Sequence, residues 1–273
     1  MEIPLTVLIP THGRPTLLER TLDSVAQCEL PESYKELVVI ENGSRAGAEQ
    51  LVADLPDRLN ARYMHESWGN KSNALNTALE TIEEGLVVFF DDDVYVEPKV
   101  LVAYEKAAGQ KSQQCYYGGS VKVDQEAPPP LRAESFFPAS VRGYSVGNSR
   151  SANFYLGFNW AAFAEDIRQI GGFNTNLGPG SPFTSVGDES DLQARMRASG
   201  FTPVDVPQAT VIHYVPKENT TLPWLTERYM HGGIAKGLKS NASIPLFITT
   251  ILNQTLQSLG VLAKGVVTLD PHK

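Results

Sequence analysis

Short apolar runs alternate with segments of helical periodicity through the first half of the chain. The apolar runs predict strands over 5–10, 35–41, 61–67 and 85–91. The spacing of apolar residues between them predicts helices over 16–27, 46–55 and 73–82. Strands that are apolar on both faces and are separated by helices indicate a parallel sheet covered on two sides. We therefore predict an α/β fold with right-handed helical crossovers.

The second half of the chain has longer irregular segments. The pattern predicts strands over 115–123, 153–164 and 202–214, a helix over 188–200, and two C-terminal helices. The segments 124–150 and 171–187 are rich in Gly, Pro and Ser, and they read as two loops. Loops of this length inside a compact domain are usually binding segments, lids or disordered. We expect one domain with a mixed sheet.

Composition narrows the class of partner. The chain has 273 residues and a formal net charge of −8, whereas a protein that binds nucleic acid presents a basic surface. Cys28 and Cys115 are the only cysteines, so we expect no disulfide framework and a reducing compartment. The N-terminus does not read as a signal peptide, and no run reaches the roughly 18–20 apolar residues of a membrane span. We expect a cytoplasmic protein that does not bind nucleic acid.

Three consecutive acids, Asp91, Asp92 and Asp93, follow the apolar run 85–90. Ligands of open α/β sheets bind outside the carboxyl ends of the strands, which is where these residues fall. Clustered carboxylates repel one another unless a cation or hydrogen-bond donors balance them. Oxygen ligands of this kind suit Mg²⁺ or Mn²⁺ held together with substrate phosphates. The alternative is a solvated acidic turn without a ligand.

Two other predicted strands end in turns that carry polar groups. The first ends at Pro10 and Thr11, and the second at Glu41 and Asn42. Neither turn has the glycine pattern of a dinucleotide-binding fold, and the chain has no phosphate-binding loop of the Walker type. The three strand ends together form a better candidate site than any one of them alone.

The order of these motifs resembles the inverting family 2 glycosyltransferases of the GT-A fold. The resemblance rests on "VLIPTHGRPTLLERTLDSV", "ELVVIENGS", "GNKSNALNTAL" and "VVFFDDDVYVEP", followed by "YGGSVKVD", "GFNWAAF", "IGGFNTNLG" and "VGDESDLQARMRASGF". It covers about residues 3–237. It implies a single GT-A domain over 1–240, with a nucleotide-binding half (1–123), an acceptor-binding half (124–240), and a helical tail over 241–273.

The same resemblance implies roles for individual residues. Asp93 would carry a Mn²⁺ or Mg²⁺ ion on the diphosphate of a nucleotide-sugar donor, and His213 would be a further metal ligand. For His213 the other interpretation is a structural histidine at a strand end. The residues implied for the donor nucleotide are Pro10, Thr11, Arg14, Glu41, Asn42, Lys71, Asn76, Asp91 and Asp92.

An inverting transfer needs a base that takes the proton of the acceptor hydroxyl. The motif "GDESDL" offers three acids at a predicted helix start, and by position the resemblance implies Glu189 as the base. Asp188 and Asp191 are the alternatives, although acids at this position also cap helices and stabilise the helix dipole. The resemblance further places Gly119, Asn159 and Trp160 at the sugar pocket, where Trp160 could stack on a ring or belong to the core.

The segment 244–267 has an apolar stripe at helical spacing. It could pack on the domain, pair with a second copy in a homodimer, or lie at the inner face of a membrane and meet a lipid-linked acceptor. Lys264 is its only basic residue.

The function expected from the sequence is therefore metal-dependent transfer of a sugar, with a UDP-sugar favoured as donor and a carbohydrate, lipid-linked or other hydroxyl acceptor. Two alternatives remain open. A sugar nucleotidyltransferase would require a Gly-rich loop with an arginine after the first strand, and "PTHGRP" has a single glycine. A catalytically silent binding module of the same fold would need neither the aspartates nor "GDESDL".

Overall fold

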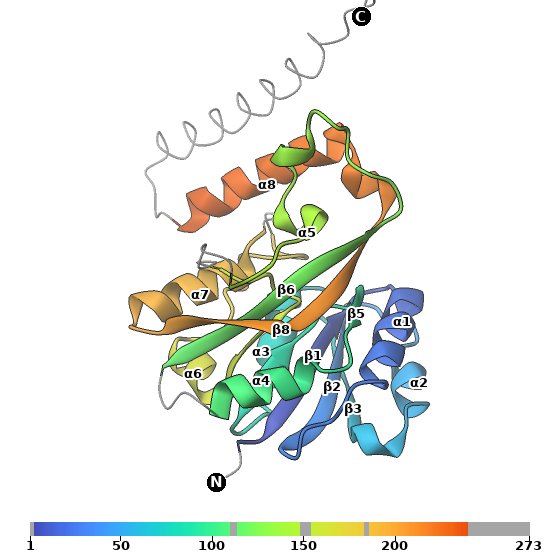
Figure 1. Ribbon diagram of the computed structural model, residues 1–273, viewed down its shortest axis with the longest axis vertical. Coiled ribbons are helices and arrows are strands. Elements are labelled where there is room, and N and C mark those ends of the chain that lie inside the picture. Colours follow the sequence, from blue (N-terminus) through green and yellow to red (C-terminus); the bar gives the residue numbers. More distant parts are fainter. Residues whose placement is uncertain (1–2, 110–113, 148–153, 183–185, 240–273) are drawn as a thin grey trace, which may run out of the picture.

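The computed structural model describes residues 3–109, 114–147, 154–182 and 186–239, and its centre is an eight-stranded mixed sheet (Figure 1). The strand order is β3-β2-β1-β4-β7-β6-β8-β5. The strands are β1 (Leu5–Thr11), β2 (Tyr34–Asn42), β3 (Ala61–Glu66), β4 (Leu86–Phe89), β5 (Val94–Val96), β6 (Cys115–Gln125), β7 (Trp160–Phe163) and β8 (Thr202–Val215).

β3, β2, β1 and β4 are parallel to one another, as the alternation of runs predicts. β7 is antiparallel to β4 and β6, β5 is antiparallel to β8, and β6 and β8 are parallel. The helices are α1 (Pro15–Val25), α2 (Ala48–Ala53), α3 (Lys71–Leu79), α4 (Val100–Gly109), α5 (Ala139–Arg142), α6 (Ala164–Gln169), α7 (Asp188–Ala198) and α8 (Leu222–Lys239), with short 3₁₀ turns η1 (Asp57–Leu59), η2 (Glu134–Phe136) and η3 (Lys217–Thr220). The predicted mixed α/β sheet is confirmed.

The sheet is covered on both faces because its central strands alternate side chains between two cores. Val7 and Ile9 of β1 belong to the core under α1, α2 and α4, whereas Leu8 points to the core under α3, α6 and α7. The same alternation holds for Val39 and Val38 of β2. The helices on each face thus share a core with the side chains that the strands direct to that face.

The predicted strand over 153–164 is largely wrong, since only Trp160–Phe163 forms a strand. In the preceding segment the backbone of Tyr155 bonds to a side chain instead of a neighbouring strand. Its N–H donates to Gln193 Oε1 (2.8 Å) and its carbonyl accepts from Gln193 Nε2 (3.0 Å). This amide from α7 takes the place of a strand ladder and holds the segment close to α7.

β5, α4 and α6 are not among the elements predicted from the apolar pattern of the sequence. β5 is only three residues long and forms by pairing with β8, which lies more than a hundred positions further along the chain. The signal for α4 is present, because Val100, Leu101, Tyr104 and Ala108 are spaced to form one buried helical face.

The part of the expected loop 124–150 that the structure describes, up to residue 147, contains η2 and α5 and packs against α8. Phe137 and Val141 are buried here with Leu225, and the ring of Phe137 stacks on that of Trp224 at 6.3 Å between centroids. α8 is the first of the two predicted C-terminal helices. The second, and with it the tail over 241–273, lies outside the described residues.

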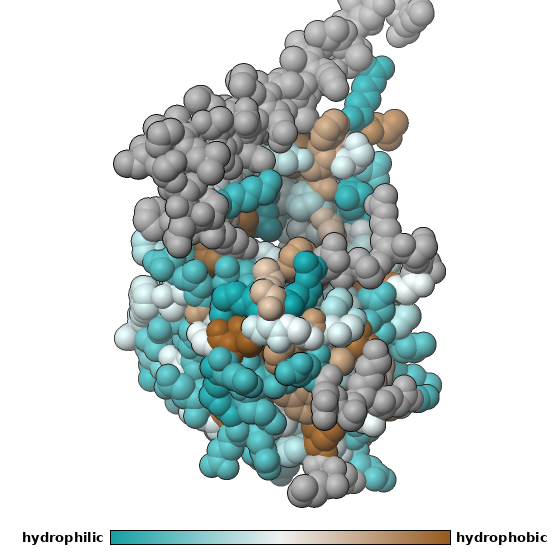
Figure 2. Space-filling model, turned by 90° about the vertical axis from the view of Figure 1, so that its left-hand side faces the viewer, coloured by the Kyte–Doolittle hydropathy of each residue, from teal (hydrophilic) through white to brown (hydrophobic). Residues whose placement is uncertain are grey.

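The surface in Figure 2 is mainly hydrophilic, with hydrophobic residues in small separate patches. Within the described part of the chain, none of the helices combines the length and the apolar character needed to cross a bilayer.

The β6–β8 pairing depends on a glycine. The register shifts between Gly119 and Ser120, and a Cβ on Gly119 would lie 1.7 Å from the carbonyl oxygen of Ala209. We expect Gly119→Ala to lower the free energy of unfolding by about 3 kcal/mol, because the strands must separate to admit a methyl group. Urea denaturation measures the change.

Gly232→Ala is the matched control, since a Cβ at Gly232 in α8 meets no atom within 4 Å. It should be neutral or stabilise by up to about 1 kcal/mol. An equal loss of stability in both variants would contradict the packing argument for Gly119.

Candidate active site

Polar residues from three parallel strand ends meet at one edge of the sheet. The hydroxyl of Thr11, at the end of β1, donates to Asp92 Oδ2 at 2.6 Å. Asn42, at the end of β2, donates from Nδ2 to the carbonyl of Thr11 at 2.8 Å. The turn after β4 therefore becomes tied to its two neighbours, as expected for ligand sites of open α/β sheets.

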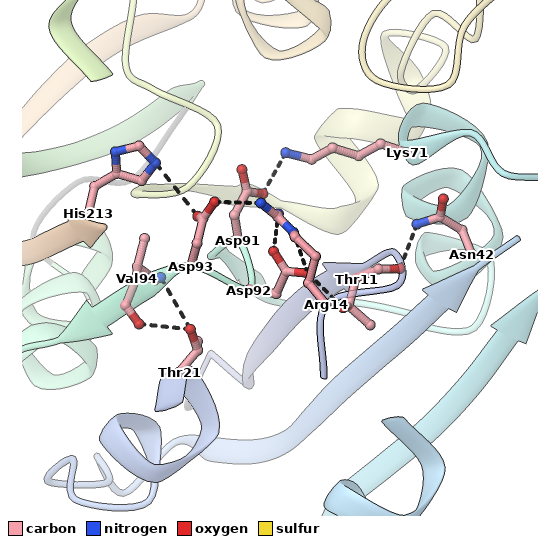
Figure 3. A network of polar contacts seen from close by, with 10 residues as sticks. All are labelled: Thr11, Arg14, Thr21, Asn42, Lys71, Asp91, Asp92, Asp93, Val94 and His213. Carbon is pink, nitrogen blue, oxygen red and sulfur yellow. Dashed lines mark hydrogen bonds and ion pairs between the residues drawn. The ribbon is translucent and has the colours of Figure 1, made fainter. Parts of the chain in front are cut away.

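The three aspartates have three different surroundings (Figure 3). Asp92 is fully buried and pairs with the guanidinium of Arg14. Asp91 pairs with Lys71 Nζ at 2.5 Å. Asp93 Oδ2 accepts from Arg14 Nη1 at 2.9 Å. Two basic residues thus compensate the repulsion among three adjacent acids.

Burial raises the pKa of Asp92, and Arg14 partly opposes this shift. Burial alone would lower the pKa of Lys71, but the carboxylates of Asp91, Asp188 and Glu189 outweigh it and raise that pKa well above the usual range. The pKa of each charged group at this edge therefore depends on the charges of its neighbours, and Lys71 stays protonated.

A cleft of about 500 Å³ opens beside these residues. We call it the donor cleft. It brings together seven of the nine residues expected at the donor nucleotide: Pro10, Thr11, Arg14, Asn42, Lys71, Asp91 and Asp92. His12, Gly69, Pro179 and Gly180 complete the lining.

The remaining two residues expected at the nucleotide do not line the donor cleft. Glu41 is buried, and its carboxylate accepts from the Ala46 N–H (2.6 Å) and the Tyr63 hydroxyl (2.7 Å). Asn76 exchanges two hydrogen bonds with the backbone of Phe173. Both side chains are used to hold neighbouring segments, so in this structure the expectation of a nucleotide contact is not met for either.

A second cavity of about 720 Å³ adjoins the donor cleft, and we call it the acceptor cavity. The two share Lys71, Asp91 and Pro179. Asp188, Glu189 and His213 also line the acceptor cavity, together with Ser140, Leu156, Gly157, Phe158, Val186, Gly187, Asn219, Trp224 and Arg228. Trp224 and Arg228 come from α8.

Glu189 is a carboxyl group with a raised pKa in the wall of the acceptor cavity. Burial and the neighbouring carboxylate of Asp188 raise its pKa to about 8, while Lys71 opposes the shift. Asp191, in contrast, lines neither cavity. It pairs with Arg195 at 2.9 Å, and that guanidinium also holds the carbonyls of Ile170 and Gly172. The structure thus engages the carboxylate of Asp191 in an ion pair, which favours Glu189 over Asp191 among the three acids.

Asp93 and His213 offer two ligands for a divalent cation. Asp93 Oδ1 is buried without a hydrogen-bond partner and lies 3.7 Å from His213 Nε2. His213 Nδ1 is 2.8 Å from the carbonyl of Ser140 and must donate to it, so in a neutral ring Nε2 presents a lone pair to Asp93. The ring is held by stacking on Phe158 at 4.3 Å.

Two acceptors that face each other in this way fit a metal ion whose other ligands come from a diphosphate. Within the residues that the structure describes, no cluster of three or more His, Cys, Asp or Glu side chains is arranged around a metal position.

The three residues expected at the sugar pocket are buried and line neither cavity, and for Trp160 this is the core position that the sequence left open. Trp160 is 0% exposed and stacks on Phe89 at 4.7 Å between ring centroids. Asn159 is equally buried and bonds to the hydroxyl of Tyr104 and to two backbone carbonyls. Gly119 is closed off by the carbonyl of Ala209.

His12 is a cleft residue that the expected set lacked. Its Nδ1 lies 2.6 Å from the carbonyl of Asn42, and its ring edge lies against Gly43, where a Cβ would come within 2.7 Å of the ring. The signal was present in the sequence, because His12 stands in the same turn as Thr11.

The family model for glycosyl transferase family 2 matches residues 6–165. The chain belongs to glycosyl transferase family 2.

Curated relatives agree with this assignment. The succinoglycan biosynthesis protein ExoM of Rhizobium meliloti is 26% identical over 238 residues, which are 83% of this chain and 72% of the relative. A validoxylamine A glucosyltransferase of Streptomyces hygroscopicus subsp. limoneus is 34% identical over 122 residues, but these are 42% of this chain and 27% of that protein. The family and its relatives make the chain a glycosyltransferase.

Solved structures agree in fold. One is the mannosyltransferase PcManGT of Pyrobaculum calidifontis, in complex with GDP-Man and Mn²⁺, with a TM-score of 0.62 at 20% identity. The match covers 98% of this chain and 76% of the PcManGT chain. Another is S. aureus TarS 1–349 in complex with UDP-GlcNAc, with a TM-score of 0.59 at 16% identity. That match covers 94% of this chain and 72% of the TarS chain. The expected GT-A fold is confirmed.

The pairing of Arg14 with buried Asp92 can be tested through stability. We expect Arg14→Met to lower the free energy of unfolding by about 1–3 kcal/mol at pH 7, because it leaves a buried carboxylate without its cation. Without Arg14 the pKa of folded Asp92 rises further above its unfolded value of about 3.9. The loss should therefore be small below pH 4 and should grow as pH rises.

Denaturation at several pH values measures this dependence. Arg45→Met is the matched control, because Arg45 pairs with Glu49 on the surface and should change stability by less than about 0.5 kcal/mol. An Arg14→Met loss that is the same at pH 3.5 and pH 7 would contradict the charge argument.

Proposed function

We propose that this chain is a metal-dependent inverting glycosyltransferase that moves a sugar from a nucleotide-diphosphate-sugar donor, preferably a UDP-sugar, to an acceptor hydroxyl. The observation that carries the proposal is the meeting of two cavities at Lys71 and Asp91. One cavity is lined by three strand ends, and the other contains a carboxylate with a raised pKa. A donor and an acceptor bound in them would touch at this junction.

The donor nucleotide would lie in the donor cleft, against Thr11, His12 and Asn42. Lys71 would face the sugar and diphosphate, together with Asp91. Structural neighbours of the same fold have been solved with UDP-GlcNAc and with GDP-Man, which supports a nucleotide sugar as ligand. UDP is favoured because the TarS complexes contain it.

Asp93 and His213 would hold Mn²⁺ or Mg²⁺. The buried Oδ1 of Asp93, which has no hydrogen-bond partner, supports this role, as does the Mn²⁺ in the PcManGT complex. When bound, the metal would neutralise the charge that develops on the departing diphosphate.

Glu189 would act as the base. Its carboxylate would take the proton of the acceptor hydroxyl while that oxygen attacks the anomeric carbon. The bond from the anomeric carbon to the diphosphate oxygen would break, and its electron pair would leave with the nucleoside diphosphate. Attack on the face opposite the leaving group would invert the anomeric configuration.

The acceptor would enter between α7 and α8, where Phe158, Trp224 and Arg228 line the acceptor cavity. Trp224 can offer its aromatic edge or face to a sugar, and Arg228 can bind a hydroxyl or an anionic group. This placement agrees with the proposed division into a nucleotide-binding half, 1–123, and an acceptor-binding half, 124–240. The name of the ExoM relative, a succinoglycan biosynthesis protein, supports a role in polysaccharide synthesis, and we propose a carbohydrate, lipid-linked or other hydroxyl acceptor.

Calorimetry tests donor and metal together. We expect one of UDP, GDP, CDP and dTDP to bind in the presence of Mn²⁺ and to lose most of its affinity in EDTA. Asp93→Ala should weaken this binding by about tenfold or more, because it removes a metal ligand and breaks the link between metal and diphosphate. Asp57→Ala, an exposed residue of η1, is the control. Binding of none of the four nucleotides would contradict the proposal.

The base has a kinetic signature. Glu189→Gln should lower kcat by about 10²–10⁴-fold, because the amide cannot accept the proton. In the unaltered enzyme kcat/KM should rise with pH through about 8, since only the ionised carboxylate is active and its pKa is raised. Glu84→Gln on the surface should change neither quantity. An active Glu189→Gln enzyme beside an inactive Asp188→Asn enzyme would assign the base to Asp188.

A further inference from the structure

One segment connects the donor cleft to the helix that carries the proposed base. Residues 173–181, which we call the strap, run along the first turns of α3 and precede α7 in the chain. Pro179 lines both cavities, and Gly180 lines the donor cleft. The strap therefore forms part of the wall where donor and acceptor would meet.

The strap is fastened to α3 through its own backbone. Asn70, Ser72 and Asn76 each bond to it by a side chain, and Lys71 does so by its N–H. The bonds are Asn70 Nδ2 to the carbonyls of Thr175 (2.9 Å) and Gly180 (3.4 Å), Ser72 Oγ to that of Leu177 (2.8 Å), Lys71 N to that of Pro179 (3.1 Å), Asn76 Nδ2 to that of Phe173 (2.9 Å), and Phe173 N to Asn76 Oδ1 (2.8 Å).

Asn70 uses both ends of its amide. It is 0% exposed, and its Oδ1 accepts from the Asn73 N–H at 2.9 Å, which caps α3 one residue before Lys71. Its Nδ2 donates to the strap. An aspartate could keep the cap but has no N–H to donate, and it would place a charge against carbonyl oxygens. The position therefore requires an amide of this length.

The strap also lies in close contact with the start of α7. A Cβ on Gly178 would come within 2.8 Å of Asp188 Cγ, and a Cβ on Gly180 would come within 1.8 Å of the carbonyl oxygen of Gly69. Both glycines have positive φ, +88° and +76°. A shift of the strap at Gly178 would therefore displace Asp188, which stands next to Glu189 at the start of α7.

We propose that Asn70 is a positioning residue for sugar transfer: through the strap it fixes the start of α7, with Glu189, relative to Lys71 and the donor cleft. This rests on the proposed function, because it takes Glu189 as base and the cleft as donor site. Asn70 touches no reacting atom. It acts by setting the distance between Glu189 and the donor cleft. The rate of transfer is sensitive to this distance, since a misplacement of about 1 Å can lower the rate about 10²-fold.

The test compares Asn70→Asp with Arg168→Met. Arg168 caps the other end of α3 by donating to the carbonyls of Leu79, Ile82 and Glu83, so its loss loosens the same helix without touching the strap. The rate to be measured is the release of UDP from UDP-glucose with water as the acceptor. Nucleotide affinity is measured separately, as the Kd of UDP in the presence of Mn²⁺ by calorimetry. We expect Asn70→Asp to lower kcat by tenfold or more, with less than a threefold change in Kd.

Ser72→Ala removes one strap bond and leaves the cap, so it keeps the test valid if Asn70→Asp does not fold. It should lower kcat by two- to fivefold and leave Kd unchanged. Hydrogen exchange gives a readout that needs no activity: amides of 188–193 should exchange faster in Asn70→Asp and Ser72→Ala, and not in Arg168→Met.

Three outcomes would overturn the inference. They are a kcat loss no greater than that of Arg168→Met, a loss of UDP affinity in proportion to kcat, or unchanged exchange at 188–193. Failure of the unaltered protein to bind any nucleotide would instead refute the proposed function, so the two failures can be told apart.

Discussion

Charge compensation at the turn after β4 is the constraint on which the rest of the site depends. Three adjacent carboxylates at a strand end are tolerated because Arg14 and Lys71 reach them from the starting points of two different helices. Arg14 stands just before α1, on the chain that leaves β1, and Lys71 opens α3. The helices on opposite faces of the sheet are thereby tied to the same edge, and the donor cleft lies between them.

The same turn sets the division of labour among the three acids. Asp92 is buried and holds Arg14, which leaves Asp91 at the junction of the two cavities and Asp93 toward β8. Their different neighbours follow from the backbone, because consecutive residues leaving a strand point in different directions. Under the proposed function, one short motif would serve structure, donor and metal at once.

Much of this arrangement could be predicted from the sequence. The parallel strands and the meeting of their ends follow from alternation and from a general property of open sheets, and the structure does bring Thr11, Asn42 and the aspartates together. The hydrogen-bond partners of Glu41 could not be foreseen, because Ala46 and Tyr63 reach it only through the fold of the following turn and strand. The sequence could not decide between core and pocket for Trp160, because an apolar run shows that a segment is buried and does not show which of its aromatic rings remain at a cavity wall.

The environment of Asp93 bears on whether the metal ion can bind before the nucleotide. Arg14 occupies Oδ2 of this carboxylate, so a cation would meet a single free oxygen and one imidazole nitrogen. A dication held by so few protein atoms keeps most of its hydration shell and exchanges rapidly with solvent. We expect it to dwell on the enzyme only when a diphosphate supplies the missing oxygens. The metal ion and the nucleotide would then bind together, and the enzyme without donor would bind little metal.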